Sequence, residues 1–327
     1  MKHGLLLINI GSPQSPAITD VRRYLRVFLS DKRVIDLPAW LRYPLLYCFI
    51  LPTRPRRSAK AYPEIWTSEG SPLISTSMRV GDALQARLGP QYQVAIGMRY
   101  GQPSIQNALD ALSDCDQITI LPLYPQYSSA ATGSSIEQVL RILKSRSIFP
   151  SITVIRDFYQ HPAFIQAQAA QIAPHLLDHD YVLFSYHGLP ENHLQKEGCK
   201  PVCVAACRPE GAARGCYRAQ CLQTTALLAN TLGLAKYGSS FQSRLGRTPW
   251  IKPYTDHILI DLAASGMKRL AVVCPSFVTD CLETLEEIGM RAKEQWLALG
   301  GETFTLIPCL NDSEQWIDAI AAIVAQS

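Results

Sequence analysis

One histidine and three carboxylates are the residues whose types and spacing could transfer protons or bind a divalent metal. His187 follows the apolar run of residues 181–184, and ligands bind at the carboxyl ends of strands in open parallel sheets. Asp280, Glu283 and Glu287 are spaced i, i+3 and i+7, so they share one face of an α-helix. Imidazole accepts protons near neutral pH, and imidazole and carboxylate groups both bind divalent ions. A hydrogen-bonded histidine in a turn and a solvated acidic helix are the alternative interpretations.

Half of the ten cysteines lie in one short window of the chain. They are Cys199, Cys203, Cys207, Cys216 and Cys221. Disulfides are not expected in a reducing cytosol, so thiols crowded in this way indicate a metal site. Four thiolates can hold an iron–sulfur cluster or structural zinc. Free surface thiols are the third interpretation.

Apolar runs and helical patterns alternate along the chain around these residues. In the first half, strands are predicted at residues 4–10, 91–98 and 117–123, and helices at residues 103–112 and 136–143. In the second half, strands are predicted at residues 181–185 and 270–274, and helices at residues 254–264 and 280–292. This alternation indicates βαβ units and parallel sheets. The sequence therefore predicts an α/β protein of two similar halves, with a cleft between their strand ends.

The two halves also correspond in detail. Residues 97–100 correspond loosely to residues 241–244, and residues 118–122 correspond to residues 271–275. We expect a first domain of residues 1–155 and a second domain of residues 156–312, with the cysteine window (about residues 195–221) as an insertion in the second. Residues 313–327 are expected to form a terminal helix that could cross back onto the first domain.

The segment from Pro38 to Pro52 is apolar on nearly every side and is interrupted by prolines. It belongs to an apolar region at about residues 30–55 and is followed by Arg54, Arg56 and Arg57. One interpretation is a helix buried against the core. The other is an exposed apolar lip beside a basic patch, which would suit a flat carboxylated ligand or a membrane surface.

Composition and charge exclude several classes of protein. The chain has 327 residues, of which 47% are hydrophobic and 18% charged, as in a globular protein rather than a disordered one. The net charge of +4 is mild and there is no long basic block, so nucleic acid is not the expected partner. The amino-terminal apolar run is too short for a signal peptide, and no segment reaches the length of a membrane span. We therefore expect a cytoplasmic protein, with peripheral contact at the inner membrane as an alternative.

Several short motifs, which follow one another along nearly the whole chain, match those of one protein family in the same order. The chain resembles the ferrochelatases, which insert ferrous iron into a porphyrin to make haem. The motifs that carry the resemblance are Leu7–Pro13, Gly70–Leu73, Met98–Tyr100, Leu123–Tyr127, Thr132–Ser135, Ser185–Pro190, Phe241–Arg244, Pro249–Trp250, Pro253–Asp256 and Glu283–Glu287.

The resemblance implies two Rossmann-like, chelatase-type domains, each a parallel sheet flanked by helices, with an active-site cleft between the domains. It also implies a lyase-type metal chelatase that inserts Fe²⁺ into protoporphyrin IX and releases two protons. A coproporphyrin ferrochelatase is the close alternative. A haem or metal carrier with the same cleft is the alternative from a different class, but a carrier would not need both His187 and Glu283.

The resemblance assigns roles to individual residues. His187 and Glu283 are implied to be catalytic, with His187 as the proton acceptor, although some accounts make such a histidine a metal ligand. His187, Glu283, Glu287 and Asp280 are expected to handle the substrate iron. Glu286 points about a hundred degrees away from Glu287 on an α-helix, so we expect it to be solvated.

The residues expected to contact the porphyrin are Ile10, Arg57, Arg99, Tyr124 and Trp250. Aromatic faces stack well on a macrocycle, and arginine pairs well with propionate groups. Arg99 could instead hold a polar network in the cleft, Arg57 could be an ordinary surface arginine, and the aromatic residues could be ordinary core residues. Other members of the family carry tyrosine or another apolar residue where this chain has Ile10, so we expect only wall contact there.

Some members of the family hold a [2Fe–2S] cluster in an internal cysteine-rich segment. On that basis we assign Cys199, Cys203, Cys207 and Cys216 as ligands of such a cluster, with Cys221 as the substitute. Zn²⁺ is the alternative metal. A bound metal would stabilise an inserted loop that has no core of its own.

Overall fold

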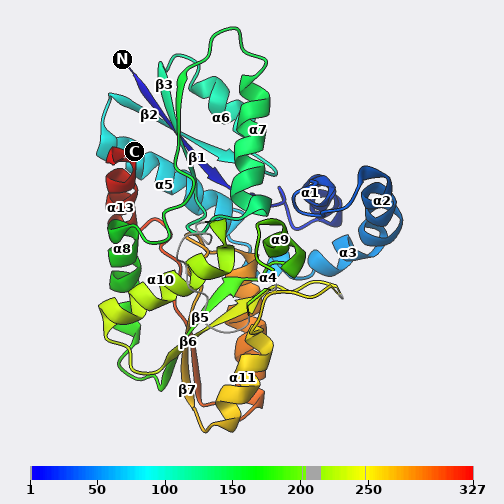
Figure 1. The fold of residues 1–327 in the computed structure, drawn as a ribbon, viewed down its shortest axis with the longest axis vertical. Coiled ribbons are helices and arrows are strands. Elements are labelled where there is room, and N and C mark those ends of the chain that lie inside the picture. Colours follow the sequence, from blue (N-terminus) through cyan, green and yellow to red (C-terminus); the bar gives the residue numbers. More distant parts are fainter. Residues whose placement is uncertain (1, 201, 204–214, 247, 327) are drawn as a thin grey trace. The chain divides into compact units, whose positions relative to one another are not determined.

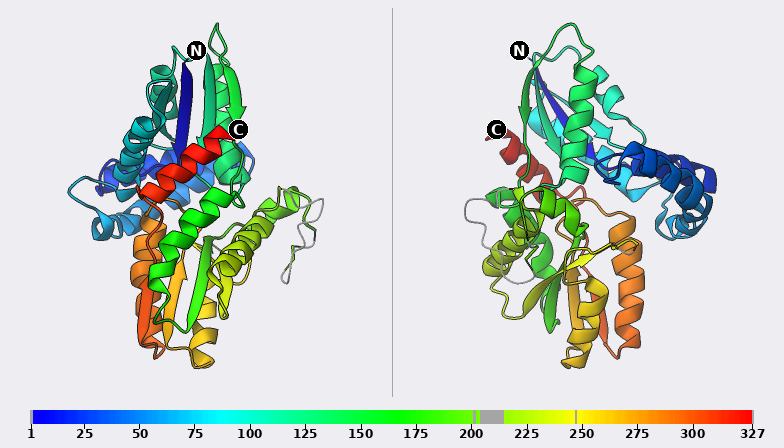
Figure 2. Two further views of the ribbon diagram at one scale, coloured as in Figure 1. Left: turned by 90° about the vertical axis from the view of Figure 1, so that its left-hand side faces the viewer. Right: turned by 45° about the vertical axis from the view of Figure 1, so that its right-hand side comes forward.

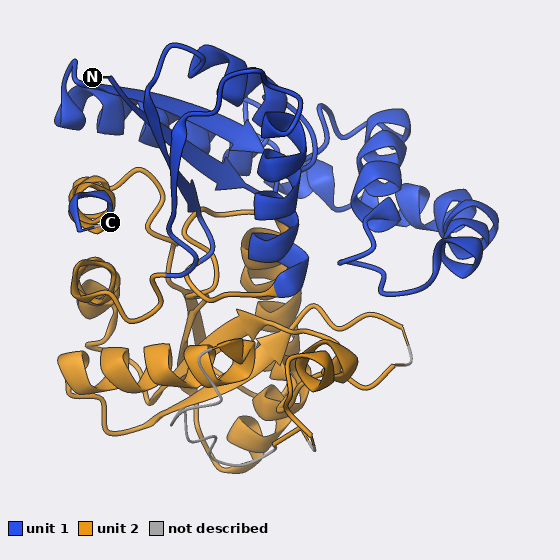
Figure 3. Ribbon diagram, turned by 45° about the horizontal axis from the view of Figure 1, so that its top comes forward, with its two compact units in different colours: residues 1–124, 129–157, 324–327 blue, residues 125–128, 158–323 orange. Residues whose placement is uncertain are grey.

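The computed structural model describes residues 2–200, 202–203, 215–246 and 248–326. The chain divides into two compact units, which are coloured separately in Figure 3. Unit 1 comprises residues 1–124, 129–157 and 324–327, and unit 2 comprises residues 125–128 and 158–323. Within the described residues, no helix is both long enough and apolar enough to cross a membrane.

Unit 1 is built on a parallel sheet with the strand order β2-β1-β3-β4 (Figure 1). Its strands are β1 (His3–Asn9), β2 (Tyr92–Met98), β3 (Gln117–Pro122) and β4 (Ser151–Val154). Residues 4–9 of β1 are all buried, as expected for a central strand covered on both faces. Helices α6 (Ile105–Ala111) and α7 (Ser134–Leu143) pack Leu109 and Val139 against Leu6 and Ile8 of β1.

Unit 2 repeats this arrangement with the strand order β6-β5-β7-β8, again parallel throughout. Its strands are β5 (Tyr181–His187), β6 (Tyr237–Gln242), β7 (Arg269–Val273) and β8 (Thr303–Leu306). Helix α11 (Thr255–Ala264), the π-helix η5 (Glu283–Ala292) and helix α12 (Lys293–Ala298) contribute to a core in which Trp296 packs with Leu183 of β5 and Phe304 of β8.

Helices α8 (Pro162–Ile172) and α10 (Tyr217–Leu232) pack against each other in unit 2 (Figure 2). The remaining elements of the chain from residue 158 onward are the short helix η3 (Ala173–His175), α9 (Glu191–Lys196) and α13 (Glu314–Ala325). In unit 1, α5 (Pro72–Leu88) packs on β2.

The predicted fold class is confirmed, and the internal correspondences fall on equivalent strands. Residues 97–100 and 241–244 lie at the ends of β2 and β6, which pair with the central strands β1 and β5. Residues 118–122 and 271–275 lie on or just after β3 and β7, which pair with the other side of the same central strands. The sequence did not show β4, β6 or β8, of which β4 is mostly exposed and β6 begins with exposed or half-buried residues.

Two predicted helices differ from the observed ones in ways that have a physical reason. The helix expected at residues 103–112 begins at Ile105, because the Ser104 hydroxyl accepts a hydrogen bond from the Asn107 N–H and caps the helix. The helix expected to begin at Asp280 is a π-helix from Glu283 onward. In a π-helix each N–H bonds to the carbonyl five residues earlier, and a sequence pattern does not separate it from an α-helix.

The apolar segment of unit 1 is exposed rather than buried in the core. It consists of α2 (Ala39–Pro44), the π-helix η1 (Leu45–Ile50) and α3 (Leu51–Ser58), and lies between α1 (Ile18–Ser30) and α4 (Tyr62–Ile65). Trp40 is 74% exposed and Phe49 is 70% exposed, whereas Leu46 and Leu51 are buried. Of the two interpretations given above, the structure therefore favours the exposed lip.

Candidate active site

The carboxyl ends of β5, β6 and β7 bring together the residues of unit 2 that could carry out chemistry. His187 is the last residue of β5, Ser243 follows β6, and Ser276 lies in the segment after β7. The same segment leads into η5, which carries Glu283 and Glu287. Because parallel strands all end at one edge of their sheet, residues far apart in the sequence meet here.

The hydrogen bond made by the ring of His187 defines its tautomer. Nδ1 lies 2.6 Å from the carbonyl oxygen of Gly188. A carbonyl oxygen can only accept, so Nδ1 carries the proton in the neutral ring, and Nε2 keeps its lone pair. The half-buried imidazole is therefore presented as a base through Nε2.

A close approach of the main chain explains the glycine after His187. A Cβ atom on Gly188 would lie 2.8 Å from the carbonyl oxygen of Gln242 and 3.2 Å from the ring of Trp250. Trp250 is buried, its Nε1–H donates to the Leu245 carbonyl at 2.9 Å, and its ring centroid lies 6.5 Å from that of His187. The structure thus places Trp250 beside the predicted proton acceptor.

The carboxylate of Glu287 is held by one residue of the neighbouring strand. The main-chain N–H of Ser243 donates to one carboxylate oxygen at 2.7 Å, and its hydroxyl donates to the other at 2.6 Å. Ser243 has a φ of 64°, which side-chain-bearing residues rarely adopt. The main chain is therefore turned at Ser243 so that both donors face the same carboxylate.

Burial raises the pKa of Glu287 above its ordinary value. The nearby charge of Glu283 raises it further, whereas the two hydrogen bonds from Ser243 and the imidazole of His187 act in the opposite direction. Glu287 therefore lies within electrostatic reach of both His187 and Glu283. A carboxyl group with a raised pKa can bind and release a proton closer to neutral pH.

Asp280 lies just before η5 and is buried. Its carboxylate accepts hydrogen bonds from the Thr284 hydroxyl at 2.9 Å and from the Asn311 side-chain amide at 2.7 Å, and a longer one from the Cys309 N–H at 3.4 Å. These bonds join the start of η5 to the segment that follows β8. The geometry favours a role for Asp280 in holding the loop.

Gln242 ties three elements together at this edge of the sheet. Its side-chain amide donates to the Glu283 carbonyl oxygen at 2.7 Å, and its side-chain oxygen accepts from the Ser185 hydroxyl at 2.7 Å. The thiol of Cys274 also donates to that oxygen. Gln242 is 3% exposed, so it fixes the first turn of η5 relative to β5 and β7.

Arg99 of unit 1 lies in a polar network instead of standing free for a ligand. Its guanidinium pairs with Asp31 at 2.5 Å and donates to the Ser134 hydroxyl at 2.7 Å. The hydroxyls of Tyr100 and Ser134 also donate to Asp31, at 2.9 and 2.6 Å. Of the two roles expected for Arg99, this geometry favours the polar network.

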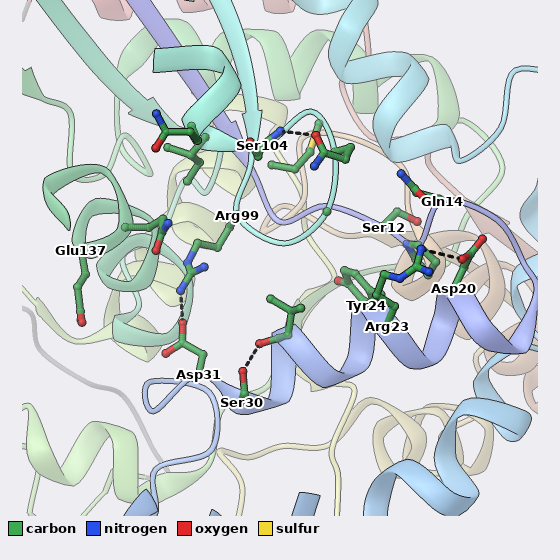
Figure 4. Close-up of a pocket in the computed structure, with 18 of the residues that line it drawn as sticks. Ser12, Gln14, Asp20, Arg23, Tyr24, Ser30, Asp31, Arg99, Ser104 and Glu137 are labelled. Carbon is green, nitrogen blue, oxygen red and sulfur yellow. Dashed lines mark hydrogen bonds and ion pairs between the residues drawn. The ribbon is translucent and has the colours of Figure 1, made fainter. Parts of the chain in front are cut away.

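Burial alone would raise the pKa of Asp31, but hydrogen bonds from Ser134, the Arg33 N–H and Tyr100, together with the charge of Arg99, lower it. Asp31 and Arg99 both line a pocket of about 700 Å³ in unit 1, where Figure 4 shows the ion pair between them. None of the residues predicted to transfer protons lines this pocket.

The other residues predicted to contact a porphyrin belong to unit 1. Ile10 is half-buried just after β1, and Tyr124 follows β3 with its hydroxyl buried beside Ser135. Burial raises the pKa of the Tyr124 hydroxyl. Arg57 lies in the last turn of α3 with an exposed side chain.

Part of the cysteine window can be placed. Cys216 is buried immediately before α10, and burial raises the pKa of its thiol, with Cys199 and Cys203 close enough to contribute. Cys221 is fully buried within α10, where its thiol hydrogen-bonds with the Tyr217 hydroxyl. Cys207 lies outside the described residues.

Metal ligands do not converge in the part of the chain that the structure describes. Across residues 2–200, 202–203, 215–246 and 248–326, no group of three or more His, Cys, Asp or Glu side chains is arranged to hold a metal ion. The thiols of Cys199, Cys203 and Cys216 lie near one another but are not arranged to coordinate one metal ion.

Sequence reasoning did not assign roles to Gln242 or Ser243, although both lie in a motif that carries the family resemblance. It also missed Ser276 and Tyr217, whose contacts with His187 join distant parts of the chain. No local pattern signals a serine with positive φ or a hydroxyl that bonds a strand end. The ordered motif itself was the one available signal, and it covered only Gln242 and Ser243.

Comparisons with known proteins agree with this architecture. The family model described as Ferrochelatase matches residues 2–327. A ferrochelatase of Legionella pneumophila (strain Lens) is 57% identical over 327 residues, which cover 99% of each chain. A ferrochelatase of Coxiella burnetii (strain Dugway 5J108-111) is 49% identical, over 100% of this chain and 94% of the relative. The solved structure of SirB from Bacillus subtilis with Fe³⁺ has a similar fold, with a TM-score of 0.56 at 12% identity over 100% of this chain and 95% of that one.

Proposed function

Because the chain belongs to the ferrochelatase family, we propose that its porphyrin substrate is protoporphyrin IX, which it converts to protohaem. Family membership makes it a lyase-type chelatase that inserts ferrous iron into a porphyrin. The two pyrrole N–H protons must leave during this reaction, so the site needs a base close to the metal's path.

The observation that carries the proposal is the tautomer of His187 beside two carboxylates. The Nδ1–H bond to Gly188 leaves Nε2 as the acceptor of a pyrrole proton. Glu287 lies close enough to His187 to interact electrostatically with it, and Glu283 lies close to Glu287. The charge of Glu287 would favour the imidazolium formed when the proton arrives.

The carboxylates are proposed to handle the iron or pass protons onward. Glu283 is the proposed catalytic glutamate, and Glu287, with its raised pKa, is suited to exchange a proton at a higher pH than an ordinary glutamate. We retain His187, Glu283, Glu287 and Asp280 as the proposed path for substrate iron. The affinity of this site for iron should be low, because the metal must be released into the macrocycle.

The test is to measure binding and turnover separately in His187→Ala and Glu283→Gln. Both variants should bind protoporphyrin IX as the unchanged protein does, measured by quenching of porphyrin fluorescence. Both should lose haem formation, by about 10²- to 10⁴-fold for His187→Ala, the usual contribution of a positioned base. If both variants retained full turnover, the enzyme mechanism would be wrong, and the alternative of a haem or metal carrier would be favoured.

Coproporphyrin is the alternative substrate, and a ring with more carboxylates would need more basic partners. The proposed porphyrin contacts are Ile10, Arg57, Arg99, Tyr124 and Trp250. Arg57 is exposed and has a charge available for a propionate, whereas Arg99 is paired with Asp31. Comparing kcat/KM for protoporphyrin IX and coproporphyrin III decides between the two substrates.

We also propose a [2Fe–2S] cluster in the cysteine window, with Cys199, Cys203, Cys207 and Cys216 as ligands and Cys221 as the substitute. The proximity of three of these thiols supports a shared metal, and Zn²⁺ remains the alternative. The complete burial of Cys221 and its bond to Tyr217 favour Cys216 as the fourth ligand. Visible absorption that dithionite bleaches, together with bound iron, supports the cluster; a colourless protein with zinc supports the alternative.

The exposed lip supports a further proposal, that a cytoplasmic protein makes peripheral contact with the inner membrane. Trp40, Tyr47 and Phe49 are half or more exposed, and the exposed Arg56 and Arg57 follow them. Sedimentation with anionic vesicles should remove the protein from solution, and Trp40→Ser with Phe49→Ser should abolish this binding. Equal sedimentation of the double variant would exclude the lip as the contact.

A further inference from the structure

Both main-chain polar groups of His187 are bonded by side-chain hydroxyls instead of a strand. The ladder between β5 and β7 ends at the pair Phe184–Val273, before His187 is reached. On the β6 side, it is the Gly188 N–H that donates, to the Gln242 carbonyl at 2.8 Å. Successive residues of a strand direct their main-chain groups to opposite neighbours. Because the Gly188 N–H points to β6, the N–H and C=O of His187 point to the other side, where β7 no longer pairs with the chain.

Tyr217 and Ser276 occupy the place of the missing strand. The Tyr217 O–H donates to the His187 carbonyl at 2.8 Å, and the His187 N–H donates to the Ser276 hydroxyl oxygen at 3.0 Å. The two hydroxyls also hydrogen-bond with each other. Since the proton of Tyr217 is already used, Ser276 is the donor in that bond. The three bonds therefore close a ring around the main chain of His187.

This ring is linked to the orientation of the imidazole. The carbonyl that Tyr217 bonds belongs to the peptide unit joining His187 to Gly188, and the next carbonyl, that of Gly188, accepts the Nδ1–H of His187. A rotation of the first peptide unit would move the second carbonyl and turn the ring. Tyr217 is only 5% exposed, so water cannot readily replace its hydroxyl.

We propose that Tyr217 is a positioning residue for His187, and that together with Ser276 it keeps Nε2 directed at the proton it must accept. This inference rests on the proposed role of His187 as the base. Tyr217 directly follows Cys216, and its hydroxyl also hydrogen-bonds with the Cys221 thiol, so the variants below are compared at equal metal content of the cysteine window.

The test is Tyr217→Phe, with Tyr186→Phe as the matched control. Tyr186 is the preceding residue of the same strand as His187, and its fully buried hydroxyl bonds to Thr225 at 2.8 Å, away from His187. In Tyr217→Phe, kcat should fall about tenfold, because the His187 carbonyl loses its hydrogen bond from the Tyr217 hydroxyl, while KM for porphyrin and for Fe²⁺ stays unchanged. Tyr186→Phe should keep the kcat of the unchanged protein, and Ser276→Ala should lower kcat in the same way as Tyr217→Phe.

A second measurement separates positioning from a general loss of structure. In a His187→Ala background, Tyr217→Phe should cause no further loss of the residual activity, because no imidazole remains to be oriented. A further tenfold loss there would overturn the proposal. So would an unchanged kcat in Tyr217→Phe, or an equal fall in Tyr217→Phe and Tyr186→Phe. If Tyr217→Phe does not fold, Ser276→Ala decides, and an unchanged kcat in that variant overturns the proposal.

These outcomes are distinct from failure of the proposed function. If His187→Ala keeps full turnover, His187 is not the base and the proposed mechanism fails. If His187→Ala is inactive while Tyr217→Phe is fully active, only the positioning role of Tyr217 fails.

Discussion

The two units share one strand order but treat charge at their strand ends differently. In unit 1, Arg99 follows β2, and its charge is neutralised by Asp31, whose carboxylate also accepts hydrogen bonds from the Ser134 and Tyr100 hydroxyls. In unit 2, Ser243 follows the equivalent strand β6 and holds Glu287, whose pKa is raised by burial and by the nearby carboxylate of Glu283. One buried carboxylate is thus stabilised in its charged form, and the other is pushed toward its protonated form.

This difference suggests a structural role for the charged carboxylate of Asp31 and fits the chemical role proposed for Glu287. A buried ion pair with a full set of hydrogen bonds holds one geometry and one protonation state. A carboxyl group with a raised pKa, beside an imidazole, can change its protonation state during a reaction. We therefore expect substitutions in unit 1 to affect mainly stability, and substitutions in unit 2 to affect mainly turnover.

The largest effect is expected at Glu283. Glu283→Gln keeps the size of the side chain but removes its charge, so kcat should fall by about 10²- to 10⁴-fold with little change in the midpoint of thermal unfolding. Steady-state haem formation and differential scanning calorimetry measure the two quantities. If Glu283→Gln instead lost thermal stability along with turnover, the expectation that substitutions in unit 2 affect mainly turnover would be wrong.

The next largest effect is expected at the ion pair of unit 1. Asp31→Asn leaves the guanidinium of Arg99, which is 11% exposed, without its counter-charge. Breaking a buried pair in this way costs about 3–5 kcal/mol of unfolding free energy, whereas removing both charges costs less. Urea unfolding should therefore show that Asp31→Asn is less stable than the double variant Asp31→Asn with Arg99→Met. Equal stability of all three proteins would show that the pair is not structural.

A pH-dependent effect is expected at Glu287. Because burial raises the pKa of Glu287 in the folded protein, the stability that its proton contributes is complete below the unfolded pKa and is lost as pH rises through the folded pKa. Glu287→Gln removes this dependence, so the variant should become more stable relative to the unchanged protein as pH rises from about 4.5 to about 8. Unfolding midpoints across that range measure the difference, and a difference with the opposite slope would mean that the pKa of Glu287 is lowered.

The smallest effect is expected at Glu286, which serves as the control on the same helix. Glu286 pairs with Arg291 at 2.8 Å; the arginine side chain is 61% exposed, but that of Glu286 is only 15% exposed, so the expectation that Glu286 is solvated was wrong. Pairs with one exposed partner contribute about 0–1 kcal/mol, so Glu286→Gln should change stability by about this much and leave kcat unaltered. Loss of turnover in this variant would show that charge anywhere on η5 matters, and that Glu283 and Glu287 are not special.

Local patterns in the sequence were sufficient for five of the eight described strands and for the residues that follow them. Continuous apolar runs predicted the central strands β1, β3, β5 and β7, because central parallel strands are buried on both faces, and they also predicted the edge strand β2. Glu283 and Glu287 remain close on η5 although it is a π-helix, since residues four apart stay near one another in either helix. The edge strand β4, whose residues are mostly exposed, carries no comparable signal.

The sequence by itself determined the fold class, the internal repeat and the positions of His187 and Glu283, because periodicity and motif order are written in neighbouring residues. Only the tertiary structure decided which groups face each other: Asp31 and Arg99 are 68 residues apart, and Ser243 and Glu287 are 44 residues apart. It likewise decided that Tyr217 bonds the main chain of His187 across 30 residues. Such contacts depend on how packed strands and helices meet in space, and neither the spacing nor the type of a residue encodes them locally.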